Sequence, residues 1–230
     1  MQSALKGGRM RTLFIGDVHG CAEELDALLT QCAWQPDDRV VLVGDLVAKG
    51  PDSAGVVRRA REQGFLAVRG NHDAHVLRWH AGRGPRGKKL KPEHQQVLDT
   101  LTPEDWAWLE SQPLYRFFPE LNVVAVHGGL VPGVPLEAQK EDELLNLRSI
   151  LPDGTPSKRV DAGAPWASLW QGPELVIFGH DAMRGIQRHP HAVGLDSGCV
   201  YGGKLSAYVM PEGRIVSVLA KRAYVDVDAS

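Results

Sequence analysis

One pattern recurs five times along the chain: a short apolar run ends beside a glycine and an Asp, Asn or His. The apolar runs cover residues 12–15, 40–43, 65–68, 123–126 and 175–178. Each run has the length and composition of a buried β-strand. Strand ends lie at the edges of a sheet, where residues distant in sequence come together. The pattern therefore predicts a cluster of polar side chains at one edge of a sheet.

Helical periodicity follows the first three runs, over residues 22–31, 52–63 and 72–79. In the first of these segments, Leu25, Leu28 and Leu29 share one face. The alternation of strands and helices predicts parallel strands joined by right-handed crossovers.

The second half of the chain is less regular. Residues 82–91 are rich in glycine and positive charge and predict a surface loop, and residues 93–101 read as a helix. Thr102-Pro103 starts another helix, because a capping hydroxyl precedes proline. We expect residues from about 82 to 112 to form a helical cap beside the polar cluster.

A further helix is expected over residues 141–150. The last three strand-like runs, residues 191–195, 205–210 and 214–219, lie close together and predict antiparallel pairing.

Composition narrows the class of protein. The chain has 230 residues, enough for one domain over 1–230, and 26 Lys and Arg against 28 Asp and Glu. The net charge of −2 gives no general attraction to nucleic acid or membranes, and no apolar stretch reaches the length of a membrane span. Residues 1–11 lack the apolar core of a signal peptide. Cys21, Cys32 and Cys199 form no C-x-x-C pair, which favours free thiols in a reducing cytoplasm.

The polar residues after the strands form a possible ligand set for divalent cations. Asp17 and His19 can reach one cation, and the two oxygens of Asp45 can bridge two. Asn71, His127 and His180 can complete the site of the second ion. Two divalent cations about 3.5–4 Å apart activate water and stabilise the attacking and leaving oxygens of phosphoryl transfer.

The motifs around these residues resemble those of the calcineurin-like metallophosphoesterases. They are Gly-Asp-Val-His-Gly at 16–20, Gly-Asp-Leu-Val-Ala-Lys-Gly-Pro-Asp-Ser at 44–53, Arg-Gly-Asn-His-Asp at 69–73, His-Gly-Gly at 127–129 and Gly-His at 179–180. Residues 195–205 are most similar to the symmetrical diadenosine tetraphosphatases. The resemblance implies an α/β fold, with two sheets in a sandwich flanked by helices. It also implies two divalent ions, with Mn expected and Co, Fe or Zn as alternatives.

The resemblance also implies roles for individual residues. Asp17, His19 and Asp45 would hold the first metal, and Asp45, Asn71, His127 and His180 the second. Further roles follow for residues of the same motifs. His72 would be the general acid with Asp73 orienting it, Arg69 would be a catalytic and substrate-binding cation, and Lys49, Arg148 and Tyr201 would bind substrate.

The activity implied is hydrolysis of dinucleoside polyphosphates, with diadenosine tetraphosphate giving two ADP by in-line attack of a hydroxide that bridges the metals. The partner is then a small nucleotide, with a capped RNA end as the one nucleic-acid exception. A Ser/Thr protein phosphatase is the alternative. It is disfavoured by Ala48-Lys49, because those enzymes carry Asp-Arg there. A non-catalytic phosphate-binding module is a third hypothesis.

Other residues leave two interpretations open. The loop cations Arg83, Arg86, Lys88, Lys89 and Lys91 either contact polyphosphate or are simply solvated. Trp106 and Trp108 either stack on a base or belong to the core. The remaining histidines carry no ligand spacing and are expected at the surface or in packing: His75, His80, His94, His189 and His191.

Overall fold

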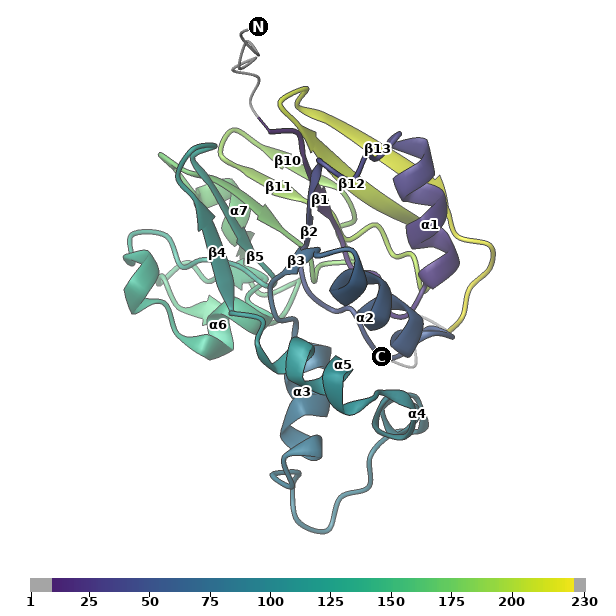
Figure 1. The fold of residues 1–230 in the computed structure, drawn as a ribbon. Coiled ribbons are helices and arrows are strands. Elements are labelled where there is room, and N and C mark those ends of the chain that lie inside the picture. Colours follow the sequence, from purple (N-terminus) through teal and green to yellow (C-terminus); the bar gives the residue numbers. More distant parts are fainter. Residues whose placement is uncertain (1–9, 226–230) are drawn as a thin grey trace, which may run out of the picture.

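The computed structural model describes residues 10–225, so most of the N-terminal segment lies outside the described residues. Two five-stranded sheets form the centre of the molecule (Figure 1). The first has the strand order β13 (Arg214–Leu219), β12 (Lys204–Met210), β1 (Thr12–Ile15), β2 (Arg39–Leu42), β3 (Leu66–Ala67). The second has the order β10 (Gln187–His189), β11 (Ala192–Gly194), β9 (Leu175–Phe178), β5 (Val123–Val126), β4 (Tyr115–Phe118).

Smaller elements complete the fold. A three-stranded sheet has the order β7 (Pro156–Ser157), β6 (Ser149–Ile150), β8 (Ala164–Pro165). The helices are α1 (Ala22–Gln31), α2 (Ser53–Glu62), α3 (Asn71–His80), α4 (Pro92–Thr100), α5 (Pro103–Glu110), α6 (Glu141–Asn146) and α7 (Trp166–Leu169), with a 3₁₀ turn at Leu136–Ala138.

The apolar runs are continuous because both faces of each sheet are buried. Along β1, Leu13 and Ile15 pack toward α1 and α2, whereas Phe14 faces the second sheet. In β5, Val124 faces the helical layer beyond the second sheet and Val123 faces the first sheet. Since successive side chains of a strand point to opposite faces, these alternations build a helix–sheet–sheet–helix sandwich. The predicted two-sheet α/β fold is confirmed, and Figure 1 shows α1 and α2 covering the first sheet.

Parallel pairing of the first three strands is also confirmed. Strand β1 pairs with β2 in parallel, Thr12 opposite Arg39, and β2 pairs with β3 in parallel. The crossovers run through α1 and α2. Asp52 caps α2 by accepting a hydrogen bond from the backbone N–H of Gly55 at 2.7 Å.

Two predictions about the second half were wrong. The run 191–195 does not join the other late strands, because β11 pairs in parallel with β9 in the second sheet, whereas β12 and β13 pair antiparallel in the first. The helix expected over 141–150 ends at Asn146, and Ser149–Ile150 forms β6 between β7 and β8. In both places pairing with a distant segment overrides the local pattern. The short strands β4 and β10 were not predicted.

Helices α4 and α5 belong to the segment expected as a cap. Figure 1 shows them beside α3 at one end of the molecule, with the loop that follows α3 extending beyond them. Val97, Trp106 and Leu109 are buried in the core cluster that also holds α1 and α2. Trp106 therefore belongs to the core, with its ring stacked on His80. A cap function for residues 82–112 stays a prediction.

No helix within residues 10–225 combines the length and apolarity needed to cross a membrane.

Candidate dinuclear metal centre

The ends of five strands bring the six predicted metal ligands together. Asp17 and His19 follow β1, Asp45 follows β2, and Asn71 opens α3 after β3. From the second sheet, His127 follows β5 and His180 follows β9. Five of these side chains line a cavity of about 470 Å³. His127 is fully buried behind it and contacts Asp45 and Asn71.

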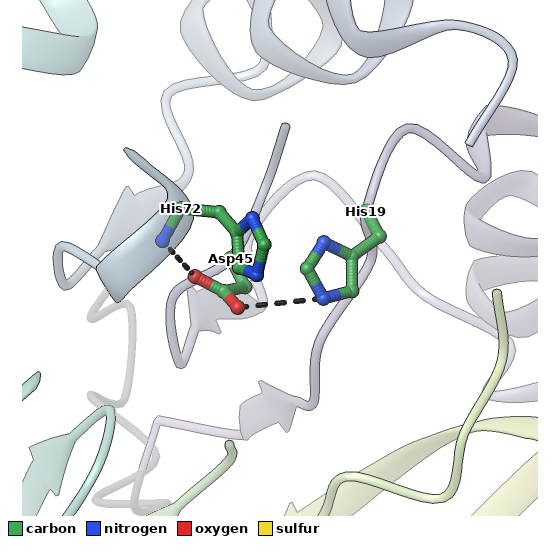
Figure 2. Close-up of side chains that lie close together, drawn as sticks. All are labelled: His19, Asp45 and His72. Atoms are coloured by element: carbon green, nitrogen blue, oxygen red, sulfur yellow. Dashed lines mark hydrogen bonds and ion pairs between the residues drawn. The ribbon is translucent and has the colours of Figure 1, made fainter. Parts of the chain in front are cut away.

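Asp45 lies at the centre of the cluster. Its Oδ2 is 3.3 Å from His19 Nε2, and its Oδ1 is 3.4 Å from His127 Nε2. Figure 2 shows the Asp45 carboxylate between His19 and His72. The backbone N–H of His72 donates to Asp45 Oδ1 at 2.9 Å. One carboxylate oxygen thus faces each side of the cluster, the arrangement that a bridging ligand requires.

Backbone carbonyls determine the protonation of the three ligand histidines. A carbonyl only accepts hydrogen bonds, so His19 Nδ1 donates to Val47 O at 3.1 Å and His127 Nδ1 donates to Val43 O at 3.0 Å. Burial lowers the pKa of His19, and it lowers that of His127 to about 4, so both rings are neutral. Their Nε2 atoms are therefore unprotonated, as metal ligation requires.

His180 uses the opposite nitrogen. Its Nε2 donates to Asn146 O at 3.2 Å, and burial lowers its pKa, so Nδ1 carries the lone pair. Its backbone N–H donates to Asp17 Oδ1 at 3.1 Å, which joins the ends of β9 and β1.

The contacts around Asp45 fit a pair of cations. Unprotonated Nε2 atoms face carboxylate oxygens at 3.3 and 3.4 Å, and His127 Nε2 lies 2.9 Å from Asn71 Oδ1. Lone pairs that face one another repel unless a positive charge lies between them. Two ligands about 2.1 Å from one cation lie about 3.0–3.4 Å apart, which is close to all three separations. The donor set therefore fits the metal pair that the family implies.

A third buried carboxylate, Asp196, was missed as a site residue. It lines the same cavity, in the loop after β11. Burial raises the pKa of Asp196 and of Asp45 to about 6, and burial together with the charges of Asp196 and Asp45 raises that of Asp17. Asp196 follows the strand-like run 191–195, so it carried the same signal as the other five strand ends.

The site is built on an unusual backbone. His19, Asp45 and His180 all have φ between 45° and 69°, a left-handed conformation that non-glycine residues rarely adopt. Two glycines allow the ligands to pack against the main chain. A Cβ on Gly70 would lie 2.2 Å from Asp45 Oδ1, and one on Gly179 would lie 2.1 Å from Asp17 Oδ1. The glycines of the motifs are therefore needed for close approach.

His72 lies next to His19 and Asp45, and one possible ligand atom from each of the three side chains lies within 4.8 Å of the others (Figure 2). The Nδ1 of His72 lies 3.0 Å from Nε2 of His94, and the two ring planes are nearly parallel, at 4°. His94 is 5 % exposed and comes from α4. His94 was expected at the surface or in packing, and its ring is packed between His72 and His75. The positions of His72 and His94 in the sequence did not predict this contact. It depends on the packing of α4 against α3.

Asp73 does not orient His72 through any contact in the described chain. Its carboxylate accepts from the backbone N–H groups of Gly70, Leu46 and Val47, at 2.9, 3.0 and 3.3 Å. It thereby joins the start of α3 to the loop that carries Asp45, which is a structural role. Burial and the neighbouring charge of Asp45 raise the pKa of Asp73 to about 7.

Three of the predicted substrate-binding residues line the metal cavity. The Nζ of Lys49 donates to the hydroxyl of Tyr201 at 2.7 Å, and Arg148 Nη2 donates to His180 O at 3.1 Å. The fourth, Arg69, lies elsewhere. Its Nη2 donates to Glu110 O at 2.7 Å at the end of α5, and Arg69 is absent from the described residues that line the cavity. The predicted phosphate contact of Arg69 has no support in this geometry.

A family model described as calcineurin-like phosphoesterase matches residues 10–210. An asymmetrical bis(5'-nucleosyl)-tetraphosphatase, PrpE of Halalkalibacterium halodurans, is 31 % identical over 92 % of this chain and 94 % of its own. A symmetrical bis(5'-nucleosyl)-tetraphosphatase of Photorhabdus laumondii is 32 % identical over 86 % of this chain and 92 % of its own.

Solved structures agree with this relationship. The crystal structure of a candidate diadenosine tetraphosphatase is 40 % identical, with a TM-score of 0.84 and coverage of 94 % of this chain and 96 % of that one. A Ser/Thr phosphatase of Saccharomyces cerevisiae is 18 % identical, with a TM-score of 0.59 over 92 % of this chain and 79 % of that one, and shares the fold. With its sandwich fold and its cluster of Asp, His and Asn at the strand ends, this chain belongs to the calcineurin-like phosphoesterase family.

Proposed function

We propose that the chain is a metal-dependent hydrolase of dinucleoside tetraphosphates that converts diadenosine tetraphosphate into two ADP. The observation that carries the proposal is the convergence of unprotonated imidazole nitrogens on the two oxygens of Asp45. The similar tetraphosphatases, which cover 92 % and 86 % of this chain, support this substrate class. Mn²⁺ is the proposed ion, since mixed carboxylate and imidazole sites suit metals of intermediate hardness.

Six residues would hold the two ions: Asp17, His19, Asp45, Asn71, His127 and His180. When bound, the ions would polarise the phosphoryl oxygens and make water nucleophilic. Lys49 and Arg148, on the wall of the same cavity, would neutralise the remaining charge on the phosphate.

His72 is the proposed general acid, and His94 positions it. Because Nδ1 of His72 faces His94, its Nε2 is the nitrogen left to hold a proton for the departing oxygen. A positioned acid of this kind contributes about 10²–10⁴ to the rate. His94 thus fills the place left by the missing acid at Ala48.

A protein-phosphatase activity has less support. It requires an open groove for a folded substrate, whereas Lys88, Lys89, Lys91 and His94 wall the space next to the metal cavity. The resemblance to the yeast enzyme is one of fold alone.

We place the activity in the cytoplasm, which the three free and buried cysteines support.

A product assay tests the proposal. Purified protein with Mn²⁺ is given diadenosine tetraphosphate, a serine phosphopeptide or capped RNA, and the products are separated by chromatography. We expect ADP as the only nucleotide product, no phosphate release from the peptide and slower turnover of RNA. Formation of ATP and AMP, or preferred turnover of the peptide, would contradict the proposal.

A further inference from the structure

A second and larger cavity adjoins the metal cavity. It measures about 750 Å³ and lies between α3, the loop 81–91, the start of α4 and one face of α6. The two cavities have four lining residues in common: Asn71, His72, Asn146 and Lys158. A ligand that leaves the metal centre past His72 therefore enters this second cavity.

Positive charge dominates the wall formed by α3 and the loop. Arg78, Lys88, Lys89 and Lys91 line this wall, and Lys158 lines the opposite side. Lys158 is paired with Asp142 at 2.6 Å. By contrast, Arg78, Lys88 and Lys89 form no ion pair within residues 10–225. These three cations are available to neutralise an anionic ligand.

Apolar and aromatic groups complete the cavity. Trp79, His75 and Leu145 line it beside the cations. Gly84 packs against the indole of Trp79, since a Cβ at this position would lie 2.5 Å from the ring. A cationic wall next to aromatic rings is complementary to a nucleotide, whose phosphates carry negative charge and whose base presents a flat face.

The position of His72 indicates which half of the substrate the second cavity would hold. A general acid must stand on the side of the leaving group, because it delivers its proton to the departing oxygen. His72 lies where the two cavities meet, its partner His94 lines the second cavity, and Lys49, Arg148 and Tyr201 line the metal cavity. The departing half of the substrate is thus the half that meets Arg78, Lys88 and Lys89.

We propose that the cavity between α3, the loop 81–91 and α6 is the leaving-group subsite, and that it binds the phosphates and nucleoside of a nucleoside polyphosphate. This inference rests on the proposed hydrolase function and identifies which half of the substrate is recognised. The proposed subsite also separates the cations of the basic loop into two pairs. Lys88 and Lys89 line the cavity, whereas Arg83 and Arg86, on the same loop and equally exposed, are absent from its described lining.

The loop provides a matched pair of variants. Lys88→Ala/Lys89→Ala and Arg83→Ala/Arg86→Ala each remove two exposed positive charges from one loop, but only the first pair changes the cavity. The values of kcat/KM are measured with Mn²⁺ for diadenosine tetraphosphate and for p-nitrophenyl phosphate, whose leaving group carries no phosphate. Binding of ATP to EDTA-treated protein is measured by calorimetry, as a readout that needs neither metal nor turnover.

The subsite predicts a specific outcome. For Lys88→Ala/Lys89→Ala, the ratio of kcat/KM between the dinucleotide and p-nitrophenyl phosphate falls about tenfold or more, and the Kd for ATP rises by a similar factor. For Arg83→Ala/Arg86→Ala, both quantities stay within about twofold of the unmodified protein, since distant exposed charges are screened.

Other results would overturn the subsite. Equal losses in both double variants would indicate a general electrostatic effect, and no loss in either would mean that the cavity does not bind the leaving group. If the protein hydrolyses p-nitrophenyl phosphate but not the dinucleotide, the proposed function fails. The ATP titration then decides on the subsite separately, because it depends on the cavity alone.

Discussion

At the scale of residues, the contact between His72 and His94 bears on the proposed role of His72 as a general acid. Ala48 has no side chain that could hydrogen-bond to a catalytic imidazole, and Asp73 is occupied by three backbone N–H groups. His94 instead lies 3.0 Å from His72 Nδ1. The orientation of the proposed general acid would therefore depend on a helix that begins twenty residues later, at Pro92.

His94→Ala should slow reactions that need a protonated leaving group. We expect kcat to fall about tenfold for phenyl phosphate and by much less for p-nitrophenyl phosphate, since a more acidic phenol departs without a proton. KM should change little. His94→Gln should restore part of the rate, because its amide can reach His72 Nδ1.

His75→Ala is the control. The ring centroid of His75 lies 4.8 Å from that of His94, but it is His94 whose Nε2 faces His72 Nδ1. Equal losses on both aryl phosphates would show that His94 supports the fold rather than the acid.

At the same scale, a substitution of Asp73 tests the stability of the fold. Asp73→Asn replaces one accepting oxygen with a donor, so at least one buried N–H of Gly70, Leu46 or Val47 loses its partner. We expect a loss of about 1–3 kcal/mol in the free energy of unfolding, measured by urea denaturation. Full stability in this variant would mean that the three hydrogen bonds add little.

At the scale of elements, α5 connects the segment 82–112 to the helices that cover the first sheet. Thr102 Oγ1 accepts from Asp105 N at 3.3 Å, and Asp105 accepts from Arg61 Nε of α2 at 3.1 Å. Buried Val97, Trp106 and Leu109 add apolar contact. The segment is therefore anchored by its two helices, while the basic loop before them is exposed.

Thr102→Ala should destabilise the protein by about 1 kcal/mol, because the cap of α5 is lost. Thermal unfolding measures the effect. Thr100→Ala removes a hydroxyl from the end of α4 that bonds only Gln96 O, and should stay within about 0.5 kcal/mol of the unmodified protein. If both variants lose the same stability, the cap of α5 has no special importance.

For the whole molecule, the candidate metal centre lies where the two sheets meet. Asp17 and Asp45 belong to the first sheet, His127 and His180 to the second, and buried carboxylates repel one another across the junction. Cations that bind only the folded protein stabilise it by about 4 kcal/mol at about 1,000 times their Kd. Removing them should therefore weaken the contact between the sheets.

The stabilisation by Mn²⁺ should depend on pH. Asp45 and Asp196 have pKa values raised to about 6, so below that pH the folded protein holds protons that the cations must displace. In metal-free protein these raised carboxyl pKa values lower stability as pH rises from about 4 to 6, because the folded state binds more protons there. His127, whose pKa is lowered to about 4, acts in the opposite sense over the same range.

As pH rises, the carboxylates of Asp45 and Asp196 and the ring of His127 lose protons, and each loss favours metal binding. Excess Mn²⁺ added to EDTA-treated protein should raise Tm by about 8–16 °C at pH 7.5. At pH 5 the increase should be less than half as large. Scanning calorimetry at the two pH values measures the difference, with Asp45→Asn as a variant that should lose most of it. Equal increases at both pH values would contradict displacement of protons from these carboxylates.

The sequence by itself determined the strands that end at the site and the six donors that follow them. These features are local, since an apolar run and the glycine after it lie within a few residues. Tertiary structure decided that His94 meets His72 and that Arg69 turns toward α5. It also decided that β11 pairs with β9 rather than with β12. Each of these contacts joins segments far apart in the chain, and their packing is set by the shapes of both partners, which no local pattern records.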